Sequence, residues 1–282
     1  MQWTPGGVSS DIEDRRQGGG GFRGVHLGLG ATILLLLLSI IFHRDFLSLF
    51  SGAPEAGSVQ SQPANGAIES PAERKQVEFV SFILDDTQKT WEHLLPQAGI
   101  PYRHAKLVLF RDVTDSACGL AQAATGPFYC PADEKIYIDL GFYDELRTRF
   151  GAPGEFAQAY VLAHEIGHHV QKLLGVSDKV RALQLRSPAE ANPLSVRMEL
   201  QADCFAGIWA HSTAQRNLID ESDIKSGIDG AGAVGDDRLQ RMSRGYVSPE
   251  SFTHGTSAQR VVWFERGLQD GQVSSCNTFA TR

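Results

Sequence analysis

The sequence predicts a mainly helical α+β domain in which a small β-sheet precedes a helix that carries the motif His-Glu-x-x-His. An apolar pattern compatible with a buried helix surrounds that motif. Short runs rich in strand-forming residues lie before it, and further helical patterns lie on both sides. The predicted strands are 106–111, 128–129 and 135–139, and the predicted helices are 77–95, 156–174, 194–211 and 257–268.

An apolar stretch near the start predicts a membrane anchor. The segment from Gly24 to Phe42 contains no Asp, Glu, Lys or Arg. A helix of this length can cross a hydrocarbon core of about 30 Å. We therefore divide the chain into a disordered cytoplasmic tail, a transmembrane helix, a flexible linker and a folded domain. The corresponding ranges are 1–23, 24–45, 46–71 and 72–282.

The charges beside this stretch predict its orientation. Arg15, Arg16 and Arg23 precede it, so the positive-inside rule places the N-terminus in the cytoplasm. The domain would then lie outside the cytoplasm, in the periplasm of a Gram-negative cell. A cleaved signal peptide is the alternative, because Ser51-Gly52-Ala53 is small enough for a cleavage site.

Net charge and cysteine content restrict the possible binding partners of the protein and its cellular compartment. The net charge is −7 and no basic stripe with interleaved aromatic residues occurs, which excludes a nucleic-acid partner. The four cysteines fit an exported domain, and they can form two disulfides in three alternative ways. We predict the pairs Cys118–Cys130 and Cys204–Cys276. Buried free thiols are the alternative, above all for Cys204.

The motif at 164–168 predicts a metal site. On a helix, His164 and His168 are one turn apart and share a face, so both imidazoles can bind one zinc ion from the same side. Glu165 lies about a third of a turn away, where it reaches a metal-activated water as the general base. His169 points away from this pair. The alternative to a metal site is a core helix that happens to carry histidines.

Two carboxylates on a later predicted helix complete this hypothesis. Glu199 and Asp203 are also four residues apart, and we predict Glu199 as the third zinc ligand. Asp203, one turn on, would accept a hydrogen bond from the outer nitrogen of a ligand histidine. A solvated acidic face is the alternative, but the apolar residues that follow predict a buried helix, where carboxylates need partners.

Four further polar residues are weaker candidates. His254 or Tyr246 could donate a hydrogen bond to an oxyanion, although a structural role is the simpler reading of each. Asp236 and Asp237 are adjacent and could bind calcium, but a helix cap or a surface turn fits them better.

The small residue Gly167, inside the motif helix, suggests that another element approaches closely.

Several long motifs carry a resemblance to a known family. They are Gly-Pro-Phe-Tyr-Cys-Pro at 126–131, Tyr-Val-Leu-Ala-His-Glu-Ile-Gly-His-His-Val-Gln at 160–171, Glu-Leu-Gln-Ala-Asp-Cys-Phe-Ala-Gly-Ile-Trp at 199–209, Gly-Asp-Asp-Arg-Leu-Gln at 235–240 and His-Gly-Thr-Ser-Ala-Gln-Arg at 254–260. With these motifs, nearly the whole chain resembles the neutral zinc metallopeptidases of bacteria.

This resemblance implies a zincin-like metallopeptidase that is tethered to the membrane by its N-terminal helix and acts on a peptide or protein substrate. It implies His164, His168 and Glu199 as ligands of Zn²⁺, Glu165 as the base and Asp203 as a hydrogen-bond partner behind the ligands. Two other functions stay open: an envelope binding protein in which zinc serves the structure, and a scaffold without metal.

Overall fold

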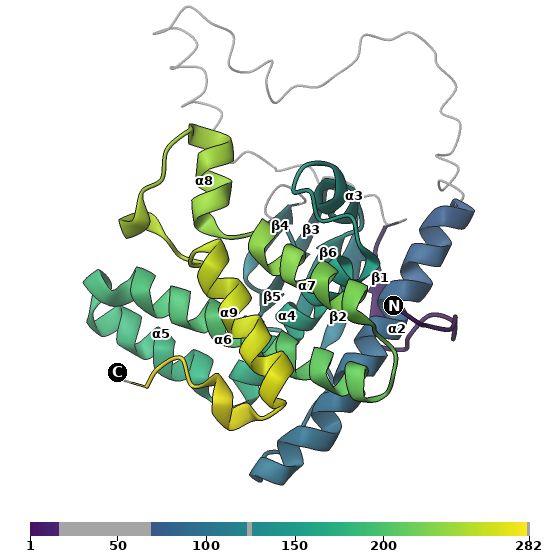
Figure 1. Ribbon diagram of the computed structural model, residues 1–282, viewed down its shortest axis with the longest axis horizontal. Coiled ribbons are helices and arrows are strands. Elements are labelled where there is room, and N and C mark those ends of the chain that lie inside the picture. Colours follow the sequence, from purple (N-terminus) through teal and green to yellow (C-terminus); the bar gives the residue numbers. More distant parts are fainter. Residues whose placement is uncertain (17–68, 123–125, 281–282) are drawn as a thin grey trace, which may run out of the picture. The chain divides into compact units, whose positions relative to one another are not determined.

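A mixed four-stranded sheet lies against the helices in the order β1-β2-β6-β5 (Figure 1). The computed structural model describes residues 1–16, 69–122 and 126–280. The pairs β1–β2 and β2–β6 are parallel, and β5 pairs antiparallel with β6. The strands are β1 Ile12–Asp14, β2 Lys106–Phe110, β5 Phe128–Cys130 and β6 Lys135–Asp139, and β3 Val113–Ser116 and β4 Gly119–Gln122 form a separate hairpin.

Helices form the larger part of the described chain, as the sequence predicts. Helix α4 carries the motif and packs against α2, α6 and α7, so that most of its residues are buried. Helix α9 packs along α6, and the two lie side by side in Figure 1. The helices are α2 Pro71–Leu94, α3 Gly141–Thr148, α4 Glu155–Leu173, α5 Val176–Arg186, α6 Ala191–Gln215, α7 Glu221–Ala233, α8 Asp236–Arg244 and α9 Ser257–Asp270, with short 3₁₀ turns at 95–98, 188–190, 249–251 and 273–276.

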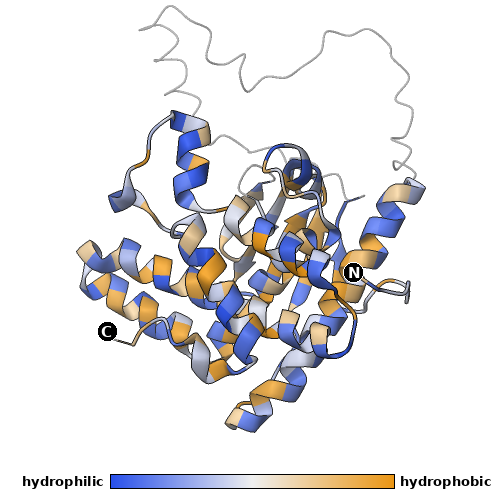
Figure 2. Ribbon diagram, in the orientation of Figure 1, coloured by the Kyte–Doolittle hydropathy of each residue, from blue (hydrophilic) through white to orange (hydrophobic). Residues whose placement is uncertain are grey.

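Hydrophobic residues concentrate on the inner sides of these elements. In Figure 2 the strands of the sheet carry many hydrophobic residues, whereas α8 is mostly hydrophilic. One continuous core joins α2, the sheet, α4, α6 and α9, and its largest fully buried side chains include Trp91, Tyr160 and Trp209. Burial of so many apolar side chains is the main force that fixes the positions of α4 and α6.

Small residues let three helices approach closely. A Cβ atom at Gly167 of α4 would lie only 2.9 Å from the carbonyl oxygen of Ala202 in α6, which confirms the close approach expected at this glycine. A Cβ atom at Gly207 of α6 would lie 2.1 Å from the carbonyl oxygen of Phe264 in α9. No larger side chain fits at either position, and the polar residues of α4, α6 and α9 are therefore brought together.

The predicted elements are confirmed in type, with differences at their ends. The β3–β4 hairpin lies outside the predicted strands, because its side chains are mostly exposed and so lack an apolar alternation. Helices α3, α5, α7 and α8 lie outside the four predicted helical ranges. Helix α6 begins at Ala191, before the predicted start at residue 194, and Glu190 before it makes no side-chain cap.

The N-terminal prediction needs correction. We expected a disordered tail over residues 1–23, but residues 1–16 belong to the same folded unit as residues 69–280, and Ile12–Asp14 form an edge strand. The reason is that this segment hydrogen-bonds along β2 and is paired by charge, which composition did not reveal. The predicted transmembrane helix 24–45 and most of the linker 46–71 lie outside the described residues. Within the described ranges, no helix combines the length and the apolar character that a membrane span requires.

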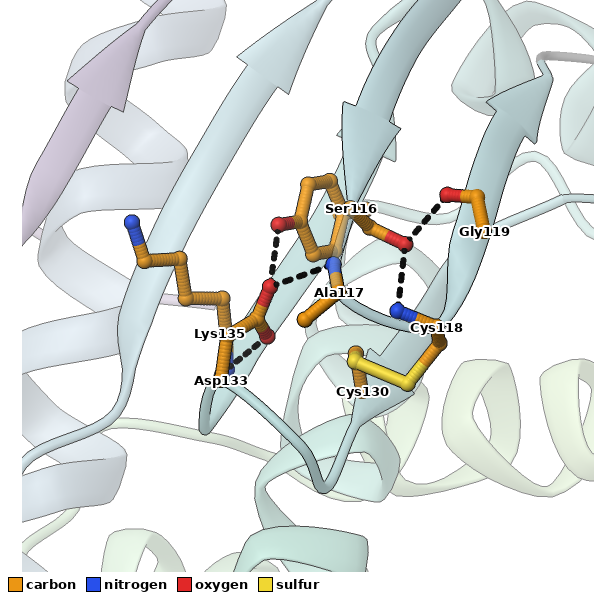
Figure 3. Close-up of a disulfide and its surroundings, with 8 residues drawn as sticks. Ser116, Ala117, Cys118, Gly119, Cys130, Asp133 and Lys135 are labelled. Carbon is orange, nitrogen blue, oxygen red and sulfur yellow. Dashed lines mark hydrogen bonds between the residues drawn. A yellow bond between two sulfur atoms is a disulfide. The ribbon is translucent and has the colours of Figure 1, made fainter.

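Both predicted disulfides are confirmed. Cys118 joins Cys130 with a Cα–Cα distance of 5.8 Å, and Cys204 joins Cys276 with a distance of 5.6 Å. Figure 3 shows how the first bond ties the β3–β4 hairpin to strand β5. Asp133 reinforces this link, since it accepts hydrogen bonds from the backbone N–H of Ala117 and from the Tyr137 hydroxyl. Such bonds persist in an oxidising compartment.

Candidate metal centre

Three side chains from two helices converge on one point. His164 and His168 come from α4 and Glu199 comes from α6, and one ligand atom of each lies within 4.8 Å of the other two. The Nε2 atom of His164 is 3.1 Å from Oε2 of Glu199, and Nε2 of His168 is 3.4 Å from Oε1. All three side chains are largely buried. Two imidazoles and one carboxylate are the ligand set of catalytic zinc sites.

The outer ring nitrogens are held so that the inner ones face the site. Nδ1 of His164 donates to Oδ1 of Asp203 at 2.9 Å, and Nδ1 of His168 donates to Oε1 of Gln171 at 2.9 Å. With the proton on Nδ1, the lone pair of each neutral ring lies on Nε2, the atom nearest Glu199. The donor set therefore fits one divalent cation such as zinc.

A buried arginine neutralises the carboxylate behind His164. Arg260 of α9 donates from Nε and Nη2 to the two oxygens of Asp203, each at 2.9 Å. The Tyr160 hydroxyl also donates to Asp203 and accepts from Arg260. All three side chains are buried, and a buried charge of either sign needs such a partner. This cluster fixes the orientation of the His164 ring.

The electrostatics favour a positive charge between the ligands. Burial by itself raises the pKa of Glu199, but His168 and His164 outweigh it and hold that pKa well below its ordinary value. Burial lowers the pKa of His164, yet Asp203 and Glu199 raise it to about 9. In the metal-free protein a proton therefore occupies the place that a metal cation would take.

Glu165 has the surroundings expected of a base. It is only 7% exposed, it lines the same cavity as the three converging side chains, and it makes no hydrogen bond or ion pair with any described residue. Burial raises its pKa, and the neighbouring imidazoles act in the opposite direction. A buried carboxylate without a fixed partner is free to exchange a proton with a molecule in the cavity.

His169 belongs to the structure rather than to the site. Its Nε2 donates to the carbonyl oxygen of Arg103 at 2.6 Å, and its Nδ1 accepts from the Tyr129 hydroxyl at 3.0 Å. Burial lowers its pKa, which keeps the ring neutral. Both nitrogens are thus used, and no lone pair is left for a metal. The prediction that it points away from the ligand pair agrees with this placement.

The loop at 253–257 places a third histidine near the site. His254 lines the cavity, and its Nδ1 is 3.2 Å from Oδ1 of Asp236. Asp236 also accepts from the backbone N–H groups of Thr253, His254 and Gly255 at 2.7, 2.6 and 3.1 Å. The carboxylate of Asp236 is thus used for the loop, as expected of a turn or cap rather than of a calcium site.

The other two weak candidates lie away from the metal centre. Asp237 accepts hydrogen bonds from the backbone N–H and the hydroxyl of Ser257, at 2.7 and 3.0 Å, and so holds the start of α9. Tyr246 is 62% exposed and does not line the cavity. Of the two oxyanion donors considered from the sequence, His254 lines the cavity and Tyr246 does not.

A cavity of about 840 Å³ opens over the converging side chains. Residues of α4 and α6, among them the converging side chains, line the cavity, and so do aromatic side chains of β5 and α3. The cavity is large enough for several side chains of a ligand. Its lining includes Phe128, Tyr129, Phe142, Phe150, Met198 and Met242.

The sequence identified the converging residues but missed part of their support. Gln171 follows His168 by three residues, so its place on the same helical face could have been inferred. Arg260 and Tyr160 gave no such signal, because their contact with Asp203 joins three helices.

Comparisons with known proteins agree with this geometry. A family model described as "Putative neutral zinc metallopeptidase" matches residues 1–279. The chain is 47% identical over 289 residues to a protein of Escherichia coli strain K12, named "Uncharacterized protein YpfJ", and the match covers 99% of both chains. It is 43% identical over 201 residues to "Uncharacterized protein Mb2605" of Mycobacterium bovis, covering 67% of this chain and 66% of that one. No solved structure matches. The chain therefore belongs to this family of neutral zinc metallopeptidases.

Proposed function

We propose that the protein is a zinc-dependent peptidase in which His164, His168 and Glu199 hold the metal and Glu165 is the general base. One observation carries the proposal: three ligand atoms lie within 4.8 Å of one another, directly beside a buried carboxylate that has no partner among the described residues. A purely structural zinc site would need a fourth protein ligand and no free base.

The chain's own residues supply the proton transfers. Zinc, when bound, polarises a carbonyl and lowers the pKa of a water molecule to about 7. Glu165 accepts a proton from the attacking water and returns it to the leaving amine. Asp236 accepts a hydrogen bond from His254 Nδ1 and raises the pKa of His254, which favours the protonated ring. The Nε2–H of that ring would donate to the oxygen that becomes negative.

The surroundings support a peptide as the substrate. Strand β5 is the last strand of the described sheet, and its residues Phe128 and Tyr129 line the cavity. An extended peptide could pair with the outer side of this strand, because an edge strand offers free backbone donors and acceptors. Phe142 and Phe150 also line the cavity, and these aromatic side chains would accept an apolar side chain of that peptide.

The test compares two glutamates of the same helix. In Glu165→Gln we expect one zinc per chain, as in the unaltered protein, and a fall in kcat for peptide cleavage of about 10² to 10⁴-fold. Glu155, in the exposed first turn of α4, is the matched control, and Glu155→Gln should leave both zinc and cleavage unchanged. Zinc is measured by metal analysis and cleavage with a library of quenched fluorescent peptides.

Two results would count against the proposal. Unchanged cleavage by Glu165→Gln would remove Glu165 as the base. Bound zinc with four protein ligands, as seen by X-ray absorption, together with no cleavage of any peptide, would favour the zinc-containing binding protein instead.

A further inference from the structure

Strand β1 completes the sheet of the metallopeptidase domain. Its residues Ile12, Glu13 and Asp14 lie opposite Leu107, Val108 and Leu109 of β2. On either side of this register, the N–H of Leu107 donates to the carbonyl of Asp11 and the N–H of Arg15 donates to the carbonyl of Leu109, both at 2.8 Å. The three β2 residues are fully buried. Without β1, an apolar strand would expose unpaired backbone groups, which is a site of aggregation.

A buried carboxylate fixes the start of this strand. Asp11 is 8% exposed and accepts from Lys106 Nζ at 2.6 Å and from Gln88 Nε2 at 2.9 Å, and His104 Nδ1 lies 2.5 Å away. These partners come from helix α2 and from the segment that leads into and begins β2. Earlier in the chain, the Trp3 ring packs edge-on against Phe79 of α2, with 5.3 Å between the ring centroids.

A buried arginine fixes the end of the segment. The Arg16 side chain is 6% exposed and pairs with Asp14 at 2.6 Å, with Glu69 at 2.9 Å and with Glu73 at 2.9 Å. Arg16 and Glu69 are 53 residues apart in sequence, and the apolar stretch at 24–42 lies between them. The two ends of the intervening chain therefore meet at the same ion-pair network.

This contact bears on the topology in the membrane. A single crossing between residues 16 and 69 would separate these residues by a hydrocarbon core of about 30 Å, whereas their side chains are 2.9 Å apart. The prediction of a cytoplasmic N-terminus rested on Arg15, Arg16 and Arg23. Two of these charges are used within the folded unit, because Arg15 pairs with Glu13 at 2.8 Å and Arg16 with three carboxylates.

We propose that residues 1–16 lie on the same side of the membrane as the metal-site domain and form a permanent edge strand of it. The single-crossing topology with a cytoplasmic N-terminus is then replaced by one in which the chain leaves the domain after Arg16 and returns to it at Glu69 on the same side. The proposal is independent of the metal and of peptide cleavage.

Cysteine labelling of the full chain in bacterial spheroplasts tests the proposal. Val8 and Val262 are matched surface positions, 61% and 55% exposed, and the four native cysteines are all in disulfides. Val8→Cys and Val262→Cys are each treated with a membrane-impermeant maleimide, before and after lysis. We expect the same ratio of labelling before to after lysis at both positions.

The opposite pattern would overturn the proposal. Labelling of Val262→Cys in intact spheroplasts, with Val8→Cys labelled only after lysis, would place a single crossing between them. A mature protein whose mass lacks residues 1–16 would equally overturn it, because the strand would have been removed by cleavage.

A second measurement tests docking of the strand directly. Arg16→Ala should lower the Tm of the purified protein by about 5 °C, because it leaves three carboxylates without their buried partner. Arg74 is the matched control: it is 64% exposed and has one contact of 3.4 Å with Glu69, so Arg74→Ala should shift the Tm by less than about 1 °C. Equal shifts in the two variants would contradict a docked N-terminal strand.

Discussion

The two sides of helix α4 use their histidines in opposite ways. On the side that faces α6, His164 and His168 each have the outer nitrogen bound and the inner nitrogen directed at Glu199. On the side that faces strand β5, both nitrogens of His169 are bound to the protein. His168 and His169 are neighbours in the sequence, yet only the first has a lone pair available for a metal.

The difference shows how a buried polar group reveals its role. A group whose every donor and acceptor is satisfied stabilises the fold and needs no ligand. A buried histidine with one ring nitrogen hydrogen-bonded and the other without a partner can bind a ligand, such as a metal ion, that is not part of the chain. Burial and residue type alone do not separate the two, since His164 and His169 are both buried histidines.

The largest expected effect comes from removing a ligand on the α6 side. His164→Ala leaves His168 and Glu199 as the only converging ligands, so we expect zinc affinity to fall by on the order of 10³-fold or more. Competition with a chromophoric chelator measures this affinity. Zinc binding as tight as in the unaltered protein would show that the open nitrogen of His164 does not coordinate metal.

Removing the histidine on the β5 side should affect stability instead. His169→Ala breaks two hydrogen bonds and leaves the Arg103 carbonyl and the Tyr129 hydroxyl without their buried partner. We expect the free energy of unfolding to fall by about 3 kcal/mol, with zinc stoichiometry unchanged. Urea denaturation followed by circular dichroism measures the loss. A loss of zinc without a loss of stability would reverse the assigned roles of the two sides.

A smaller fall in zinc affinity is expected when the His168 ring loses its orienting hydrogen bond. Gln171 accepts from His168 Nδ1 and donates to the carbonyl of Met198 at 2.7 Å. Gln171→Ala should lower zinc affinity by about 10- to 100-fold, because the His168 ring loses the partner that orients it. The same chelator competition measures it, and an effect as large as that of His164→Ala would mean that Gln171 does more than orient the ring.

The smallest effect is a pH dependence of zinc uptake. Although burial lowers it, the carboxylates raise the pKa of His164 to about 9 in the metal-free protein, so zinc must displace a proton at neutral pH. Zinc affinity should rise by up to about tenfold per pH unit as the pH approaches 9. The protonated ring stabilises the metal-free fold below its unfolded pKa of about 6.5, and this contribution is lost as pH rises through about 9.

Calorimetric titration of zinc in two buffers with different ionisation enthalpies measures the released proton. A titration at pH 7 with no proton release would show that the metal-free site is not protonated. That result would remove the electrostatic contrast between the raised pKa of His164 and the lowered pKa of His169.

The sequence by itself determined the elements that carry chemistry. The spacing of His164 and His168 follows from one helical turn, and so does that of Glu199 and Asp203, because residues four apart share a helical face. The same local reasoning predicted strands β2, β5 and β6. It also predicted the close approach at Gly167, where only a residue without a side chain fits.

Only the tertiary structure showed which residues from distant parts of the sequence contact one another at the site and in the sheet. Arg260 reaches Asp203 from α9 because glycines let α6 and α9 pack closely, and no local pattern encodes a contact between residues 57 apart in sequence. The N-terminal strand was mistaken for a disordered tail for the same reason. Three strand residues have no period of their own to detect, and their order comes from hydrogen bonds and charges that β2 and α2 provide.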